Sequence, residues 1–105
     1  MSESIKYCES LTRYQRLKTR VVHIGDVPIG GEYPIRVQSM TTTDTMNTKA
    51  TVEQSIRMIE AGCEYVRITA PSIKEAQNLA KIKKELRKQG YTAPLIADIH
   101  FTPNA

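Results

Sequence analysis

Four polar side chains in this sequence stand among apolar residues in short segments that are rich in strand-forming residues. They are Gln38 in PIRVQSM, Arg67 in EYVRIT, and Asp98 and His100 in PLIADIH. The planar guanidinium of an arginine presents a fork of donors that matches phosphate oxygens. An aspartate can accept a hydrogen bond from a hydroxyl group or orient a histidine, and a histidine can donate to a phosphate or transfer a proton. We therefore expect an anionic, oxygen-rich ligand, although these side chains alone do not identify a reaction.

The spacing of these residues indicates a repeated structural unit. Gln38, Arg67 and Asp98 follow one another at intervals of 29 and 31 residues, which suits successive strand–helix units of a parallel sheet. After an N-terminal arm we expect a hairpin that turns at Gly25-Asp26, and then strand, helix, strand, helix and strand. The predicted ranges are 1–18 for the arm, 19–31 for the hairpin, 34–40, 64–69 and 94–100 for the later strands, and 51–61 and 73–89 for the helices.

Local signals mark where the two helices begin and end. Capping-box spacings set the starts, following glycines set the ends, and apolar residues at helical spacing set the buried faces. The run 41–45 (TTTDT) is too polar to be buried and predicts a loop. The capping boxes are Thr51 with Gln54 and Ser72 with Glu75, the stop signals are Gly62 and Gly90, and the second helix is expected to bury Ile73, Ala76, Leu79 and Leu86.

Alternation along the predicted strands separates an apolar face from a polar one. The apolar face suits a covering layer of helices, whereas the polar residues fall toward the carboxyl ends of the strands, where barrel enzymes place their sites. The apolar set is Ile35 and Val37, Val66 and Ile68, and Leu95 and Ala97. The opposite set is Arg36 and Gln38, Arg67 and Thr69, and Asp98 and His100, of which Gln38, Arg67, Asp98 and His100 are the candidate site residues.

The first strand–helix loop helps to choose between two α/β architectures. A dinucleotide-binding fold needs a glycine-rich turn after its first strand, and QSMTTTDTM contains no glycine. The fold class we predict is therefore α/β, the N-terminal portion of a TIM-type (β/α)8 barrel preceded by a short β-hairpin. A full barrel needs about 250 residues, so we expect residues 19–105 to supply the hairpin and the first three strands of an incomplete barrel domain in a longer enzyme.

A structural interpretation of Arg67 and Asp98 stays open beside the functional one. The two side chains could form a buried ion pair between neighbouring strands that only holds the barrel together. Removing both charges from water makes such a pair a poor source of stability. Polar residues in phase on three strands favour a binding site.

Composition excludes several classes of protein. The chain has 105 residues with 40% hydrophobic and 25% charged residues, which is typical of a globular protein. No apolar run approaches the roughly 20 residues of a membrane span, and the N-terminus lacks the apolar stretch of a signal peptide, so we expect a cytoplasmic protein without a membrane partner. Cys8 and Cys63 lack the spacing of a zinc site. The net charge of +4 has two main sources, a basic N-terminal stretch (13–20) and basic residues on the second predicted helix (81–88). No row of stacking aromatic residues accompanies them, so we expect no nucleic-acid partner.

Four segments carry a resemblance to a known family. IGDVPIGG (24–31), PIRVQSMTTTDT (34–45), AGCEYVRIT (61–69) and PLIADIHF (94–101) resemble the 4-hydroxy-3-methylbut-2-enyl diphosphate synthases. The opening YCESLTRYQRLKTR (7–20) is similar to the large form of this family, which is found in plants and some bacteria.

The resemblance implies an oxidoreductase of the methylerythritol phosphate pathway of isoprenoid biosynthesis. Its reaction is the reductive ring opening of 2-C-methyl-D-erythritol 2,4-cyclodiphosphate to 4-hydroxy-3-methylbut-2-enyl diphosphate. The family uses a 4Fe–4S cluster, held by three cysteines and one glutamate in a C-terminal domain, and electrons from ferredoxin or flavodoxin. The motifs of the family place Arg67, Asp98 and His100 at substrate-binding positions, and they place Gln38 there less specifically. We expect no catalytic or metal-binding residue here, an inactive fragment, and a full-length homodimer.

Two other functions remain as alternatives. One is a different phosphate-binding barrel enzyme, related to dihydropteroate synthase. The other is a non-catalytic basic module that binds nucleic acid. Cluster-type cysteines downstream would exclude the first, and a binding titration across salt concentrations would expose the second.

Overall fold

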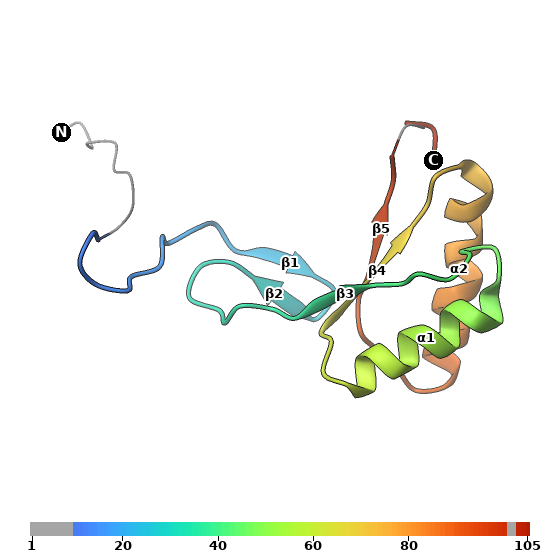
Figure 1. Cartoon of the computed structure of the whole chain (residues 1–105), viewed down its shortest axis with the longest axis horizontal. Coiled ribbons are helices and arrows are strands. Elements are labelled where there is room, and N and C mark those ends of the chain that lie inside the picture. The colour runs from blue at the N-terminus through green and yellow to red at the C-terminus, as the bar shows by residue number, and fades with distance from the viewer. Residues whose placement is uncertain (1–9, 101–102) are drawn as a thin grey trace.

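The computed structural model describes residues 10–100 and 103–105, so the first nine residues of the predicted arm lie outside it. Within the described ranges, no helix is both long and apolar enough to cross a membrane. The elements are arranged as a hairpin followed by a larger α/β unit (Figure 1). They are β1 (Val22–Ile24), β2 (Val27–Ile29), β3 (Gln38–Met40), α1 (Thr48–Glu60), β4 (Tyr65–Thr69), α2 (Ile73–Lys88) and β5 (Leu95–Asp98).

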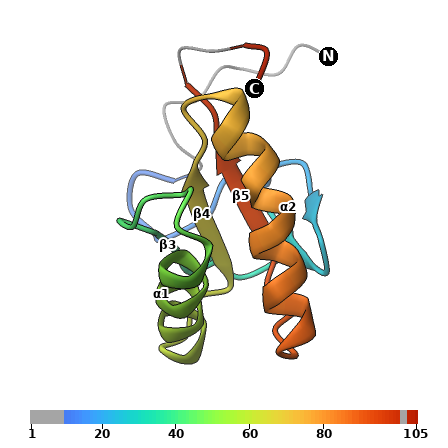
Figure 2. The same cartoon turned by 90° about the vertical axis from the view of Figure 1, so that its right-hand side faces the viewer.

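The α/β unit is a parallel sheet of order β3-β4-β5 with both helices on one face (Figure 2). Val66 and Ile68 of β4 point into the helix layer and are fully buried. The core is completed by Val52, Ile82 and Leu86 from the two helices. The predicted order of strands and helices is confirmed, and so is the apolar phase of β4, because every second residue of a strand faces the same layer.

The first strand of this sheet is shorter than predicted, since only Gln38–Met40 of the range 34–40 is a strand. Its ladder with β4 begins at Val37, whose carbonyl accepts from the N–H groups of Glu64 and Tyr65 at 2.8 and 3.2 Å. Ile35 is 74% exposed and Val37 is 52% exposed. The prediction that the helix layer covers both is wrong, because α1 packs mainly on β4 and α2 on β5.

Helix α1 begins earlier than predicted. Asn47 is its N-cap, and the Asn47 Oδ1 atom accepts a hydrogen bond from the Ala50 N–H at 3.1 Å. The predicted capping box of Thr51 and Gln54 is wrong, because both side chains instead bind the preceding loop. An asparagine in the N-cap position satisfies an otherwise unpaired N–H of the first turn, which allows the helix to start there. As predicted, the helix ends just before Gly62, which has a φ of 115°.

Helix α2 agrees with its predicted range to within one residue and ends before Gly90. The Ser72 hydroxyl donates to the Glu75 carboxylate, as the capping-box spacing suggests, but makes no hydrogen bond to the helix backbone. The buried stripe of this helix is Asn78, Ile82 and Leu86. The expected burial of Ile73 is wrong, since it is 45% exposed. It lies five residues before Asn78, and at 3.6 residues per turn that places it on a different face.

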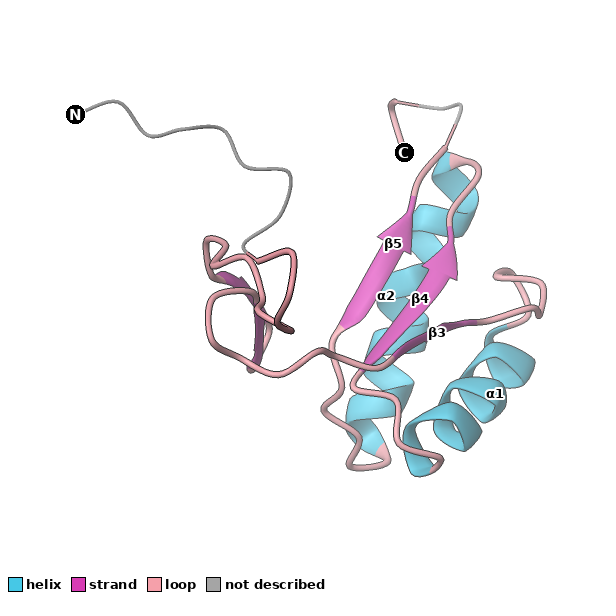
Figure 3. Ribbon diagram, turned by 60° about the vertical axis from the view of Figure 1, so that its left-hand side comes forward, coloured by secondary structure: helices cyan, strands magenta, loops and turns pink. Residues whose placement is uncertain are grey.

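The hairpin lies at the amino ends of the sheet strands, on the side away from the helices (Figure 3). β1 and β2 pair antiparallel around the predicted turn at Gly25-Asp26. The Tyr65 hydroxyl, at the start of β4, donates to the Val27 carbonyl. Gly25 has a φ of 55°, and a Cβ there would lie 2.8 Å from the Pro94 side chain, so a larger residue would be strained and would clash. The hairpin thus closes the amino end of the sheet.

Candidate functional site

The sheet face opposite the helices carries the predicted site residues in successive rows. Arg67 of β4 pairs in register with Met40 of β3 and Ile96 of β5. One row further toward the carboxyl ends, Thr69 pairs with Asp98. Residues paired across parallel strands point to the same side of the sheet. Arg67 and Asp98 therefore share the open face and lie diagonally to one another.

Arg67 and Asp98 form an ion pair on this face. The Arg67 Nη2 atom lies 3.1 Å from Asp98 Oδ2, and the two side chains are 42% and 19% exposed. The ion pair between neighbouring strands that the structural interpretation expects is therefore present, but it is only partly buried. A partly exposed pair of this kind contributes little to stability, about 1 kcal/mol or less, so it leaves both a binding and a supporting role open.

The guanidinium of Arg67 retains unused hydrogen-bonding capacity. Its Nε atom is buried and has no hydrogen-bond partner among the described residues. Buried donors are almost always paired in folded proteins, and an unpaired one commonly marks a site that a ligand or water completes. This donor and the exposed part of the same fork lie on the open face, beside the Asp98 carboxylate.

The other two predicted site residues lie above and below this pair. His100 is exposed and follows the end of β5 by two residues, so it extends the set beyond the carboxyl end of the sheet. Gln38 is the first residue of β3 and pairs with Tyr65, one row before Arg67. The expectation that Gln38 lies at the carboxyl ends, level with Arg67, is wrong. Its level depends on the register of β3 against β4, which equal sequence spacing does not determine. Roles in ligand binding stay predictions for all four residues.

The loop between β3 and α1 borders this end of the sheet. It was expected to be unburied, yet Thr41 is 5% exposed and Thr45 is 3% exposed. The Thr41 N–H donates to the Arg67 carbonyl at 3.0 Å, and the Thr45 hydroxyl donates to the Thr69 carbonyl at 2.7 Å. The second bond satisfies the buried Thr45 hydroxyl, whereas the Thr41 hydroxyl is buried without a hydrogen-bond partner among the described residues.

Both helices hold this loop through side-chain amides, and the sequence pattern does not predict that these amides lie near the site. Gln54 of α1 accepts from the Thr42 and Thr43 N–H groups at 2.8 and 3.2 Å. Asn78 of α2, itself 5% exposed, donates from Nδ2 to the Thr45 carbonyl at 2.7 Å. Asn78 has a detectable signal in the sequence, because it stands in helical phase with the buried Ile82.

Comparison with known proteins decides the family. Residues 19–105 match the family described as the GcpE TIM-barrel domain. This chain belongs to that family. It is 61% identical over 92 residues to the 4-hydroxy-3-methylbut-2-en-1-yl diphosphate synthase (flavodoxin) of Parabacteroides distasonis, a match that covers 88% of this chain and 15% of the relative.

Two further relatives of the family bear the same kind of name. The synthase (flavodoxin) of Protochlamydia amoebophila is 54% identical over 100 residues, covering 95% of this chain and 15% of the relative. The chloroplastic synthase (ferredoxin) of rice is 48% identical over 98 residues, covering 93% of this chain and 13% of the relative. The resemblance to the synthase family, including its plant form, is therefore confirmed. The chain spans about 15% of the length of the bacterial relatives.

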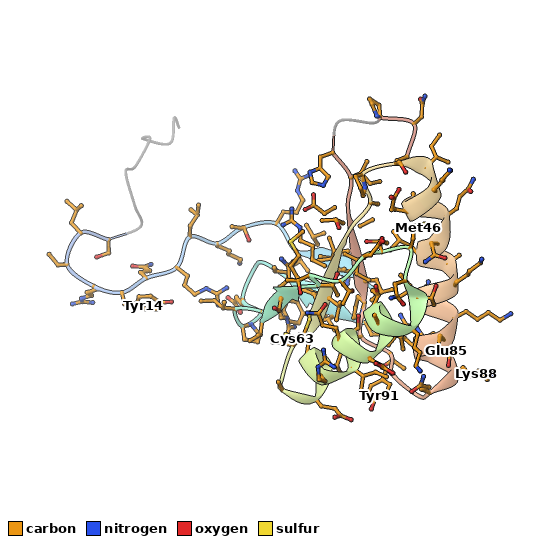
Figure 4. All side chains as sticks on the ribbon, turned by 45° about the vertical axis from the view of Figure 1, so that its right-hand side comes forward. Tyr14, Met46, Cys63, Glu85, Lys88 and Tyr91 are labelled. Carbon is orange, nitrogen blue, oxygen red and sulfur yellow. The ribbon has the colours of Figure 1, made fainter. Side chains whose placement is uncertain are left out.

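An iron–sulfur cluster does not fit the residues that the structure describes. Within those residues, no group of three His, Cys, Asp or Glu side chains is placed to hold a metal ion. Cys63 is a free thiol near the C-terminal end of α1 (Figure 4), and Cys8 lies outside the described residues. A 4Fe–4S cluster takes four protein ligands, mostly thiolates. No chemical step through a cluster is therefore assigned to these residues.

Proposed function

We propose that this chain supplies the first part of the substrate-binding barrel of a 4-hydroxy-3-methylbut-2-enyl diphosphate synthase. The reaction is the two-electron reductive ring opening of 2-C-methyl-D-erythritol 2,4-cyclodiphosphate, with loss of water, to 4-hydroxy-3-methylbut-2-enyl diphosphate. Membership of the family and the names of its relatives support this proposal.

The observation that carries the proposal for this segment is the unsatisfied guanidinium of Arg67. Its Nε donor is buried and unpartnered among the described residues, while Asp98 holds only the Nη2 end of the fork. A diphosphate offers several anionic oxygens, which suit a planar fork through charge-assisted bonds. In the proposed complex Arg67 binds the diphosphate and Asp98 orients the guanidinium.

His100 and Gln38 complete the proposed substrate-binding set. His100 follows the carboxyl end of β5, where it can donate to a phosphate or a hydroxyl of the ligand. Gln38 lies one row below Arg67, where its amide can donate and accept at the floor of the site.

The reducing chemistry belongs to parts of the enzyme outside this segment. We propose a 4Fe–4S cluster with ligands in a C-terminal domain, which supplies electrons when bound, and flavodoxin or ferredoxin as the donor, following the names of the relatives. The proposed full-length enzyme is a cytoplasmic homodimer. Within this chain, the residues bind and orient the substrate.

The test uses the full-length protein that contains this segment. It is purified anaerobically, its iron and sulfide contents are measured, and it is incubated with the cyclodiphosphate and reduced flavodoxin. The expected result is 4-hydroxy-3-methylbut-2-enyl diphosphate detected by mass spectrometry. The matched control ligand is 2-C-methyl-D-erythritol, which lacks the phosphates and should not be consumed. A protein with full cluster content that leaves the cyclodiphosphate unchanged contradicts the proposal.

A further inference from the structure

The carboxyl half of β4 extends beyond the strand beside it. β3 ends at Met40, and the last backbone bond between the two strands runs from the Thr41 N–H to the Arg67 carbonyl at 3.0 Å. In a regular parallel ladder, the next bond on this side would reach the carbonyl two residues later, that of Thr69. The chain turns away before it can supply that N–H.

A side chain takes the place of the missing backbone donor. The Thr45 hydroxyl donates to the Thr69 carbonyl at 2.7 Å. This distance is ordinary for a hydroxyl-to-carbonyl hydrogen bond. The ladder between β3 and β4 is thereby continued by one rung, although the rung comes from a residue five positions after the end of the strand.

Thr45 is itself held in place from the second helix. Its carbonyl accepts from Asn78 Nδ2 at 2.7 Å, and the same amide nitrogen donates to the Thr48 hydroxyl at 3.0 Å. Thr45 is 3% exposed and Asn78 is 5% exposed. Buried polar groups whose hydrogen bonds are satisfied rigidify the region that they join. The hydroxyl of Thr45 therefore meets Thr69 from a fixed position.

The rung supports the part of the sheet that carries the proposed binding site. Thr69 pairs in register with Asp98, the Asp98 carbonyl accepts from the Ala70 N–H at 2.9 Å, and the Asp98 carboxylate holds Arg67. We propose that Thr45 is a positioning residue, whose hydroxyl fixes the carboxyl end of β4 and so the geometry of Arg67 and Asp98 toward an anionic ligand. This inference rests on the proposed function, because the ligand is the cyclodiphosphate.

The test compares Thr45→Val with Thr45→Ser in the full-length enzyme. Valine keeps the branched shape and removes the hydroxyl, whereas serine keeps the hydroxyl. The matched control is Ser55→Ala, because the Ser55 hydroxyl makes a buried bond of the same length, 2.7 Å, to the Thr51 carbonyl inside α1. The measurements are the dissociation constant of the cyclodiphosphate by calorimetry without reductant, kcat and KM with reduced flavodoxin, and the melting temperature.

We expect Thr45→Val to raise the dissociation constant and KM about threefold to tenfold, the factor that corresponds to one typical hydrogen bond. Thr45→Ser should restore both values to within about twofold of the wild type, because the rung is retained. Ser55→Ala should leave binding unchanged, because its hydrogen bond lies inside α1.

Three results would overturn the inference, and they can be distinguished from one another. If Thr45→Val lowers the melting temperature but binds the cyclodiphosphate like the wild type, Thr45 is a structural residue only, and the proposed function stands. If the wild-type protein with its cluster intact neither binds nor converts the cyclodiphosphate, the proposed function fails and this inference fails with it. An equal loss of binding in Thr45→Val and Thr45→Ser would also contradict a role for the hydroxyl.

Discussion

Replacement of Arg67 by lysine separates a binding role from a supporting one. Lysine keeps the positive charge but loses the planar fork and the Nε donor, which is buried and unpartnered among the described residues. If the proposed diphosphate completes that donor, the variant loses at least one charge-assisted hydrogen bond, worth about 1.5–3 kcal/mol. This free energy corresponds to a decrease of about 10-fold to 150-fold in kcat/KM.

The effect of the same substitution on stability should be small. The ion pair to Asp98 involves a side chain that is 42% exposed, so solvent screening limits its contribution to about 1 kcal/mol. For a barrel of ordinary size, such a loss lowers the melting temperature by less than about 4 °C. Catalytic efficiency and stability should therefore change by very different amounts.

Arg36→Lys provides a matched control in the same chain. Arg36 donates from Nε to the Pro28 carbonyl at 2.8 Å and from Nη1 to the Glu64 carboxylate at 2.9 Å, at the amino end of the sheet. Its side chain is 14% exposed, so its loss should lower the melting temperature more than that of Arg67. Its hydrogen bonds go to Pro28 and Glu64 and to none of the four proposed site residues, so kcat/KM should remain unchanged.

The assay measures kcat/KM for the cyclodiphosphate, the cluster content and the melting temperature of both full-length variants. An Arg67→Lys enzyme with full cluster content, unchanged kcat/KM and a lowered melting temperature would refute the reasoning. Arg67 would then belong to the support of the sheet. A parallel loss of activity in Arg36→Lys would show that the assay reports general destabilisation.

Two further predictions concern α1. Asn47→Ala removes the hydrogen bond to the Ala50 N–H and should weaken the first turn by about 1 kcal/mol. Hydrogen exchange at residues 48–52 should then be faster than in the wild type, while exchange in α2 stays unchanged. Equal exchange rates at residues 48–52 in the variant and the wild type would contradict this prediction. The hydrogen bond to Glu60 raises the pKa of Tyr91 from its ordinary 10.0, so the contact stabilises the fold below pH 10 and is lost as the pH rises through the raised pKa. The melting-temperature difference between wild type and Tyr91→Phe should narrow above pH 10, and a difference independent of pH would refute this assignment.

Much of the fold follows from local patterns in the chain. The two glycines that end the helices, the alternation in β4 and the helical period of α2 predict elements that the structure confirms to within a few residues. These signals succeed because the conformation of a left-handed glycine and the burial of every second strand residue depend on near neighbours in sequence.

Local sequence patterns do not predict where α1 begins or that threonines of the run 41–45 are buried. Asn47 and Thr51 are both good N-cap residues, and the choice between them depends on whether Thr51 is needed elsewhere. In the structure the Thr51 hydroxyl donates to the Asp44 carbonyl at 3.0 Å. Burial of a polar side chain is favoured when distant groups satisfy its hydrogen bonds, and for Thr45 those groups come from β4 and α2.

Some features of the candidate site are also predictable from the sequence, whereas others depend on the tertiary structure. The types and phase of Arg67 and Asp98 were readable from the chain, because alternation within each strand assigns them to one face. Their ion pair, the lower level of Gln38 and the support from Thr45 came from the three-dimensional arrangement. Each of these depends on the register between strands and on contacts between residues far apart in sequence, which hydrogen bonding and packing in the folded protein set.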